Sequence, residues 1–228
     1  VKSLKQEYTG VYFERFILGN WVAAEGCIYP DYAKEPERYR LKRMPQDISF
    51  ATVGVDFGGN KSAHAFVCVG FSKSLKKAYV LDEFYLKEEI NPKRLEREFV
   101  KFIKKQKKRC PVYEAFCDNA ESTLICGLRR AAENAGVAVD VRKAKKNRIV
   151  ERIRFVNAML AQNRLFVAER CSYVSEAMKS AVWDADAKED TRLETGTVNV
   201  DSLDAFEYAL EPYMRLMLET ARGERRST

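Results

Sequence analysis

Four aspartates have the residue type and the placement that metal-dependent chemistry needs. Asp56 ends the apolar run ISFATVGVDF, and Asp118 ends a second apolar run, VYEAFCD. Asp201 and Asp204 come later, in NVDSLDAFEYAL, where their three-residue spacing puts both carboxylates on one face of a helix. Acids drawn from separate elements repel one another unless a cation offsets their charge, and hard divalent cations prefer oxygen ligands. The pattern indicates a divalent-metal site, which would suit two-metal cleavage of a phosphodiester.

Two of these aspartates also have a purely structural interpretation. Asp56 can be a turn residue before Gly58 and Gly59, and Asp201 can be the N-cap of the last helix. Asp204 lies one turn inside that helix, where a side chain contributes less to capping the helix N-terminus. The sequence leaves both interpretations of Asp201 open.

The glycine turn after this first aspartate invites comparison with a phosphate-binding loop. Gly54 and Gly59 have the separation of a P-loop, but one extra residue intervenes before Lys61. The following HAFVCVGFS is strand-like, so the loop lacks the helix N-terminus that holds phosphates. We therefore expect the glycines to turn a hairpin, with His64 as a strand residue near the mouth of the site.

The sequence patterns around the acids predict the helices and strands of an α/β fold. ISFATVGVDF, HAFVCVGFS and AYVLDEFYL predict three strands of an antiparallel meander. Further strands at 112–118, 137–141 and 165–168 alternate with helices, which implies parallel pairing added to the meander. Helices are predicted at 92–108, 121–136, 149–160, 171–180 and from about 202, the last one interrupted by Pro212.

The composition and the first residues of the chain indicate how many domains it forms and where they begin. With 228 residues, 46% of them hydrophobic and 32% charged, the chain reads as one globular domain with appendages, without an apolar run that could cross a bilayer. Residues 1–47 lack clean periodicity, so we expect an irregular lead-in and a folded core that begins near Ile48. The chain starts at Val1 without a leader, which predicts a cytoplasmic fragment of a longer protein. The six cysteines lack zinc-ligand spacing and predict buried, reduced thiols.

Two basic stretches would suit a polyanionic partner. They are KFIKKQKKR at 101–109 and RKAKKNR at 142–148. Solvated helix faces explain either stretch about equally well. For 101–109 we favour the solvated helix face.

The motifs GVDFG, DNAES and VDSLDAFEYAL, on this order of elements, resemble the nuclease domain of the large terminase subunit of tailed bacteriophages. The lead-in YTGVYFERFILGNWVAAEGCIYPDY resembles the segment that joins the terminase ATPase to its nuclease. The resemblance implies a ribonuclease H-like mixed sheet flanked by helices. It also implies that residues 1–47 are a linker from an absent N-terminal ATPase domain, and that 48–228 are the nuclease domain.

By this resemblance, Asp56, Asp118 and Asp204 match the family's three catalytic, metal-binding aspartates, which bind two divalent cations, Mg²⁺ or Mn²⁺. Glu121 matches an acid often found beside the second aspartate. Asp201 occupies the place of a histidine that is common in the family. Glu121 and Asp201 are therefore auxiliary candidates.

The resemblance also implies a DNA substrate and a packaging machine. Lys145, Lys146 and Arg148, at the start of the helix after VAVDV, are candidates for contacts with DNA phosphates. The implied partners are double-stranded DNA, the ATPase domain of the same full-length chain, the small terminase subunit and the portal, and no membrane. The implied activity is endonucleolytic cutting of concatemeric viral DNA in the cytoplasm of an infected or lysogenic bacterial host.

Two other classes of function stay open. A catalytically idle ribonuclease H-like module could bind DNA or protein without cutting. GVDFGG also resembles the Asp-x-Gly-Gly phosphate turn of actin-like and sugar-kinase-type ATPases, although the chain has no second glycine-rich loop for the other half of such a protein.

Overall fold

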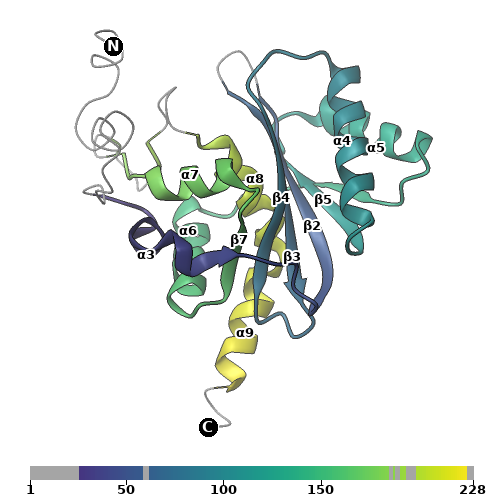
Figure 1. The fold of residues 1–228 in the computed structure, drawn as a ribbon. Coiled ribbons are helices and arrows are strands. Elements are labelled where there is room, and N and C mark those ends of the chain that lie inside the picture. The colour runs from purple at the N-terminus through teal and green to yellow at the C-terminus, as the bar shows by residue number, and fades with distance from the viewer. Residues whose placement is uncertain (1–25, 59–61, 185–186, 188–190, 194–198, 225–228) are drawn as a thin grey trace.

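A mixed sheet of seven strands forms the middle layer of the computed structural model, which describes residues 26–58, 62–184, 187, 191–193 and 199–224 (Figure 1). Three strands form the predicted antiparallel meander: β2 (Ile48–Asp56), β3 (His64–Ser72) and β4 (Ala78–Leu86). The outer strands pair in parallel: β1 (Arg40–Leu41) with β7 (Leu165–Ala168), β7 with β4, β5 (Val112–Cys117) with β2, and β6 (Asp140–Lys143) with β5. The resulting order, β1-β7-β4-β3-β2-β5-β6, confirms the expected mixed sheet.

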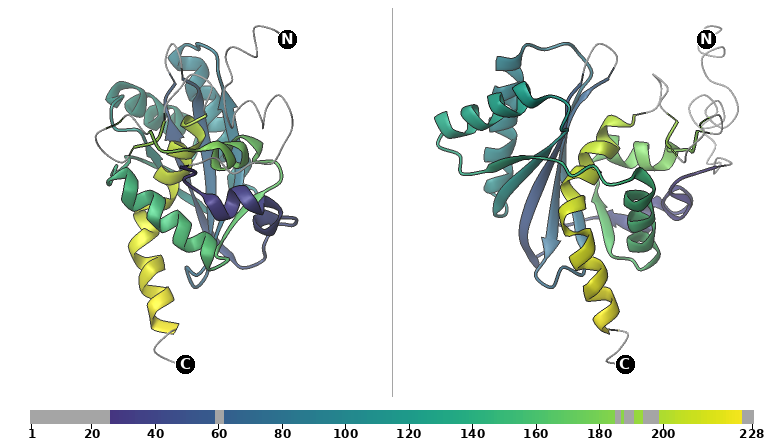
Figure 2. Two further views of the ribbon diagram at one scale, coloured as in Figure 1. Left: turned by 90° about the vertical axis from the view of Figure 1, so that its left-hand side faces the viewer. Right: turned by 180° about the vertical axis from the view of Figure 1, so that it is seen from behind.

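Helices cover both faces of this sheet (Figure 2). One face carries α4 (Pro92–Lys107) and α5 (Ser122–Asn134). The other carries α3 (Pro30–Lys34), α6 (Ile149–Ala161), α7 (Ser172–Ser180) and α8 (Asp201–Leu210). After α8, a 3₁₀ turn (Glu211–Tyr213) that contains Pro212 precedes α9 (Met214–Glu224), as the sequence predicts. None of the described helices is long and apolar enough to span a membrane.

Helix α8 lies directly on β2, and Gly54 makes this approach possible. A Cβ atom at Gly54 would lie 1.7 Å from the backbone oxygen of Ala205. Two residues earlier in β2, the Thr52 hydroxyl donates a hydrogen bond of 2.7 Å to the Ala209 carbonyl. The two elements therefore run in opposite directions, and the start of α8 lies beside the end of β2.

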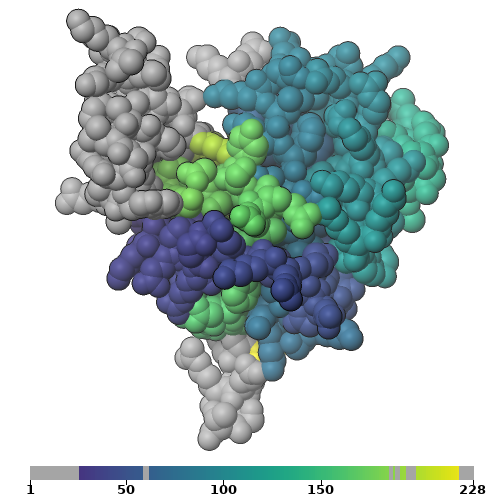
Figure 3. All heavy atoms as spheres, viewed as in Figure 1, coloured from purple at the N-terminus to yellow at the C-terminus, as the bar shows by residue number. Residues whose placement is uncertain are grey.

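The segment before the meander is folded, so the expectation of an irregular lead-in up to residue 47 is wrong for residues 26–41. Pro30 and Pro36 begin short helices, and β1 joins the sheet. Aromatic side chains of this segment are buried in the same core as α6 and α7, namely Tyr29, Tyr32 and Tyr39. Figure 3 shows the purple start of the described chain lying against the green surface around α7. The packing could not be predicted because the sequence of this segment has no regular apolar spacing. The folded core therefore begins well before Ile48.

The predicted strand at 137–141 is also misplaced. Gly136 ends α5 with a φ of +63°, and β6 begins only at Asp140, opposite Glu114 of β5. Val137 is buried without belonging to the strand, which explains why apolar residues alone place the strand too early.

The basic stretch at the end of α4 is only partly a solvated face. Lys105 and Arg109 form ion pairs with buried Asp82 of β4, at 2.7 and 2.9 Å. The ammonium of Lys107 donates to the carbonyl oxygens of Val112 and Ala138. These cations hold α4 on the sheet, because β4 presents an acid to them.

Candidate functional site

Asp56 and Asp118 lie at the carboxyl ends of two neighbouring parallel strands. Val55 of β2 pairs with Cys117 of β5, and the backbone N–H of Asp118 donates to the Val55 carbonyl at 2.9 Å. Open α/β sheets place their ligand sites at such strand ends. The sheet therefore brings together the first two predicted site residues.

Helix α8 adds Asp201 and Asp204 from above β2. The N-cap of α8 is Val200, and the capping bond comes from Asn199, whose side-chain oxygen accepts from the Ser202 N–H at 3.1 Å. Asp201 is not the N-cap. Its Oδ2 accepts a hydrogen bond of 3.0 Å from the backbone N–H of Ala63. Asp201 thus ties the start of α8 to the hairpin that follows Asp56; Gly59 and Lys61 of this hairpin lie outside the described residues.

Asp56 has the most unusual environment of the four aspartates. It is only 8% exposed, and no hydrogen bond or ion pair joins its side chain to another described residue. Burial raises its pKa well above the usual range, and the negative charges of Asp204, Asp201 and Asp118 raise it further. The structure thus places the other three acids within electrostatic reach of Asp56.

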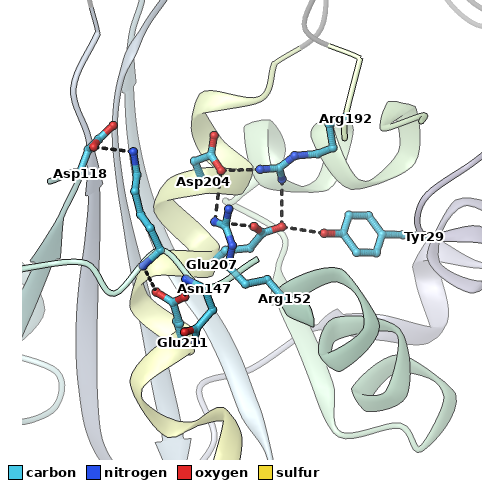
Figure 4. Close-up of polar contacts among 9 residues, drawn as sticks. Tyr29, Asp118, Asn147, Arg152, Arg192, Asp204, Glu207 and Glu211 are labelled. Atoms are coloured by element: carbon cyan, nitrogen blue, oxygen red, sulfur yellow. Dashed lines mark hydrogen bonds and ion pairs between the residues drawn. The ribbon is translucent and has the colours of Figure 1, made fainter. Parts of the chain in front are cut away.

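Asp118 is held by one basic side chain and by the backbone. The ammonium of Lys146 lies 2.7 Å from its Oδ1, and the Ala120 N–H donates to the same oxygen at 2.9 Å. The second oxygen makes neither of these two contacts, and Figure 4 draws the ion pair of Asp118 as a dashed line. Lys146, predicted as a DNA contact, is therefore part of the acidic site.

The loop before α6 fixes where this lysine stands. Lys146 has a φ of +53°, and the backbone N–H groups of Lys146 and Asn147 donate to the Glu211 carboxylate. The other two predicted DNA contacts, Lys145 and Arg148, are exposed on the same loop. Basic groups therefore stand both in the site and at its edge.

Asp204 is held by two arginines that the sequence did not single out. Arg152 of α6 lies 3.4 Å from its Oδ1, and Arg192 makes a shorter contact with the same oxygen (Figure 4). Both arginines also contact Glu207, one turn further along α8. The spacing of acids at 201, 204 and 207 on one helix could have indicated Glu207, but no comparable signal marks either arginine.

Two further predicted residues stand apart from this cluster. Glu121 is exposed at the N-cap position of α5 and makes no side-chain capping bond. His64, the first residue of β3, accepts a hydrogen bond of 3.1 Å on Nδ1 from the Gly58 N–H, and burial lowers its pKa. His64 thus closes the hairpin after Asp56.

The donor set fits a divalent cation in its chemistry, but the side chains do not form a closed ligand set. A buried carboxylate without a partner among the described residues, surrounded by other acids, is an electrostatic environment that a cation would relieve. In the conformation described, however, no group of three or more His, Cys, Asp or Glu side chains among the described residues could hold a metal ion. Lys146 and the two arginines occupy the space beside Asp118 and Asp204 instead.

Comparison with solved structures identifies proteins that share this fold. Neither a protein-family model nor a curated protein sequence matches the chain. The large terminase of a thermophilic bacteriophage matches with a TM-score of 0.66 and 24% identity, over 92% of this chain and 51% of that protein. The P22 large terminase nuclease domain matches with a TM-score of 0.61 and 16% identity, over 87% of this chain and 99% of the domain. The nuclease domain of the bacteriophage SPP1 large terminase, with bound Mn, matches with a TM-score of 0.53 and 20% identity, over 76% and 94%.

These matches confirm the ribonuclease H-like fold that the sequence predicts. The chain is similar to large terminase nuclease domains over most of its length, and it spans about half the length of the large terminase of the thermophilic bacteriophage.

Proposed function

We propose that this chain is the nuclease domain of a phage large terminase, a metal-dependent endodeoxyribonuclease that cuts concatemeric viral DNA. The observation that carries the proposal is Asp56, a buried carboxylate without a described partner, placed beside Asp118, Asp201 and Asp204 at the carboxyl end of the sheet. The fold shared with terminase nuclease domains supports it.

Asp56, Asp118 and Asp204 would hold the cations. When bound, two Mg²⁺ or Mn²⁺ ions would activate a water molecule and stabilise the leaving oxygen of the phosphodiester. Asp118 and Asp204 each meet their basic partners through Oδ1, so the other oxygen is the one available to a cation. The Mn bound in the SPP1 nuclease domain supports a divalent cation as the cofactor. Glu121 and Asp201 stay auxiliary candidates.

The basic groups would then serve the DNA. Lys145 and Arg148 are exposed next to Lys146, which reaches Asp118. A DNA phosphate that enters the site would meet this loop, and the contacts would add salt-dependent affinity for any sequence. Lys146 is in a position to exchange its carboxylate partner for such a phosphate, since its side chain is 33% exposed.

The larger assembly follows from the same proposal. The chain would be preceded by an ATPase domain and would work with a small terminase subunit and a portal in the bacterial cytoplasm. The large terminase of the thermophilic bacteriophage supports a further domain in the same protein, because about half of that terminase lies outside the match.

A catalytically idle DNA-binding module is the second candidate. The observation that favours it is the occupation of Asp118 and Asp204 by basic side chains, with no ligand set among the described residues.

Plasmid cleavage distinguishes the two candidates. We expect the purified protein to nick or linearise supercoiled plasmid with Mg²⁺ or Mn²⁺, and to stop in excess EDTA. Asp56→Ala should lower the rate by about 10³-fold or more, because metal catalysis is worth several kcal/mol and about 1.4 kcal/mol is tenfold. Asp31→Ala, at an exposed position of α3, is the matched control and should cut normally. Salt-sensitive DNA binding without cleavage would favour the idle module, and cleavage that survives Asp56→Ala would exclude the proposed site.

A further inference from the structure

Glu207 is a buried acid next to the site to which the proposed reaction assigns no role. Its side chain is 1% exposed, and it lies one helical turn after Asp204 on α8. Three groups meet it at 2.9 Å: the Tyr29 hydroxyl and Arg192 at Oε1, and Arg152 at Oε2 (Figure 4). These groups come from three distant segments of the chain.

Each arginine bridges two carboxylates. Arg152 and Arg192 contact Glu207 and also Oδ1 of Asp204. Arg192 does this with two nitrogens of its planar, rigid fork, Nη1 on Glu207 and Nη2 on Asp204, whereas a lysine ammonium is a flexible point charge. Arg152 contacts both carboxylates through Nη1. Asp204 is therefore held from two sides by groups that are themselves held by Glu207.

The charges of this group balance only when Glu207 is included. Two arginines face two carboxylates, so neither arginine depends on Asp204 alone for neutralisation. Asp118 is different, because its one basic partner among the described residues, Lys146, is 33% exposed, while the Arg192 side chain is 1% exposed. The partner of Asp118 can withdraw into solvent, but the partners of Asp204 are fixed.

Stability alone does not explain the network of Asp204, Glu207, Arg152 and Arg192. Buried ion pairs are often no more stabilising than apolar packing of the same volume. Here the buried Nε atoms of Arg152 and Arg192 also find no acceptor among the described residues, and Glu207 Oε2 accepts no hydrogen bond although Arg152 lies 2.9 Å away, which adds a cost. Partners of a metal-binding carboxylate, in contrast, are needed to fix its orientation.

We propose that Arg152, Arg192 and Glu207, with Tyr29 behind them, are positioning residues that set the orientation of the Asp204 carboxylate for cation binding. This inference rests on the proposed function, since it takes Asp204 as a cation ligand. It assigns no contact with DNA or cation to these four residues.

Arg192→Lys tests the proposal at constant charge. Lysine cannot bridge Asp204 and Glu207 as a guanidinium does, so we expect Mn²⁺ affinity, measured by calorimetry, to fall by about 10-fold to 100-fold. The turnover number for plasmid should fall and KM for DNA should stay unchanged. Arg215→Lys is the matched control, because Arg215 forms an exposed pair with Glu219 on α9, and its Mn²⁺ affinity should stay within twofold.

Tyr29→Phe is the second variant, and it keeps the core filled. It removes one hydrogen bond from Glu207 at the far end of the network. Loss of about 1 kcal/mol of support predicts up to about fivefold weaker Mn²⁺ binding, although Tyr29 has no contact with Asp204. This variant decides the question if Arg192→Lys does not fold.

The outcomes separate the two proposals. Wild-type protein that binds no Mn²⁺ and cuts no plasmid contradicts the proposed function itself. Wild-type protein that does both, together with folded Arg192→Lys and Tyr29→Phe variants of unchanged Mn²⁺ affinity, overturns only the positioning role. A lower unfolding temperature with unchanged Mn²⁺ affinity would show that the network stabilises the fold and nothing more.

Discussion

Asp56 and Asp82 are both buried aspartates of the central sheet, but their surroundings are opposite. Asp82 of β4 faces the end of α4, where Lys105 and Gln106 of the helix and Arg109 just after it all contact its Oδ2 within 2.9 Å. Burial alone would raise the pKa of Asp82, but the hydrogen bonds and charges of these partners hold it below the usual range.

Asp56 of β2 has no such partners among the described residues. Burial and three neighbouring aspartates raise its pKa well above the usual range. Buried polar groups are normally satisfied, so an exception calls for an explanation. The comparison shows that charge alone does not mark a site in this protein; Asp82 is a structural anchor, while Asp56 is the residue that we propose as a cation ligand.

The contact between α8 and β2 is the first place to test this contrast. In Gly54→Ala, the new Cβ meets backbone atoms of α8, which cannot move aside singly, so we expect a loss of about 3 kcal/mol in the free energy of unfolding. Gly70→Ala is the matched control near Asp82, because its Cβ would meet the flexible end of Leu81, at a cost of about 1 kcal/mol. Urea unfolding measures both. Equal losses would mean that α8 can shift on β2 and does not hold Asp204 at a fixed place.

Removal of the charge of Asp82 should be the next largest effect. Asp82→Asn leaves Lys105 and Arg109 without their carboxylate, and we expect a loss of about 2 kcal/mol at pH 7, reduced by the partial exposure of both cations. Because the pKa of Asp82 is lowered in the fold, its contribution exists above its ordinary pKa of about 4 and disappears as pH falls below that value.

Urea unfolding at pH 7 and pH 3 would measure this loss. Asp140→Asn, at an exposed residue paired with Arg142, is the control and should stay within about 0.5 kcal/mol. A loss that persists unchanged at pH 3 would show that the Asp82 charge is not the cause.

Asp56→Asn should have the opposite sign. With EDTA present, we expect the free energy of unfolding to rise by on the order of 1 kcal/mol, because an unpaired buried charge is removed. A raised pKa means that the protonated form favours the fold, so wild-type stability falls as pH rises from about 4, and the gain in the variant grows with pH. Chemical denaturation between pH 4 and pH 8 tests this; destabilisation by Asp56→Asn would mean that Asp56 is already satisfied.

The sequence predicted the site residues that lie at the ends of regular strands or on a regular helix face. Asp56 and Asp118 follow β-branched apolar runs, so their place at strand ends could be predicted, and Asp204 follows from the helix spacing. Arg192 could not be predicted, since it stands in a polar stretch without periodicity and reaches Asp204 only through the tertiary fold. Arg152 lies on the buried face of α6, where a charged residue contradicts the amphipathic pattern. Tyr29 could not be predicted either, because it lies in the segment for which the sequence predicts an irregular lead-in. The aromatic residues of this segment pack in the core without regular spacing along the sequence.

A crystal soaked in Mn²⁺ tests the central claim most directly. The account predicts anomalous density for two ions between Asp56, Asp118 and Asp204, with Arg152 and Arg192 still in contact with Glu207. A crystal without Mn²⁺ at Asp56, in which Lys146 and the two arginines keep their present carboxylate partners at saturating metal, would contradict it.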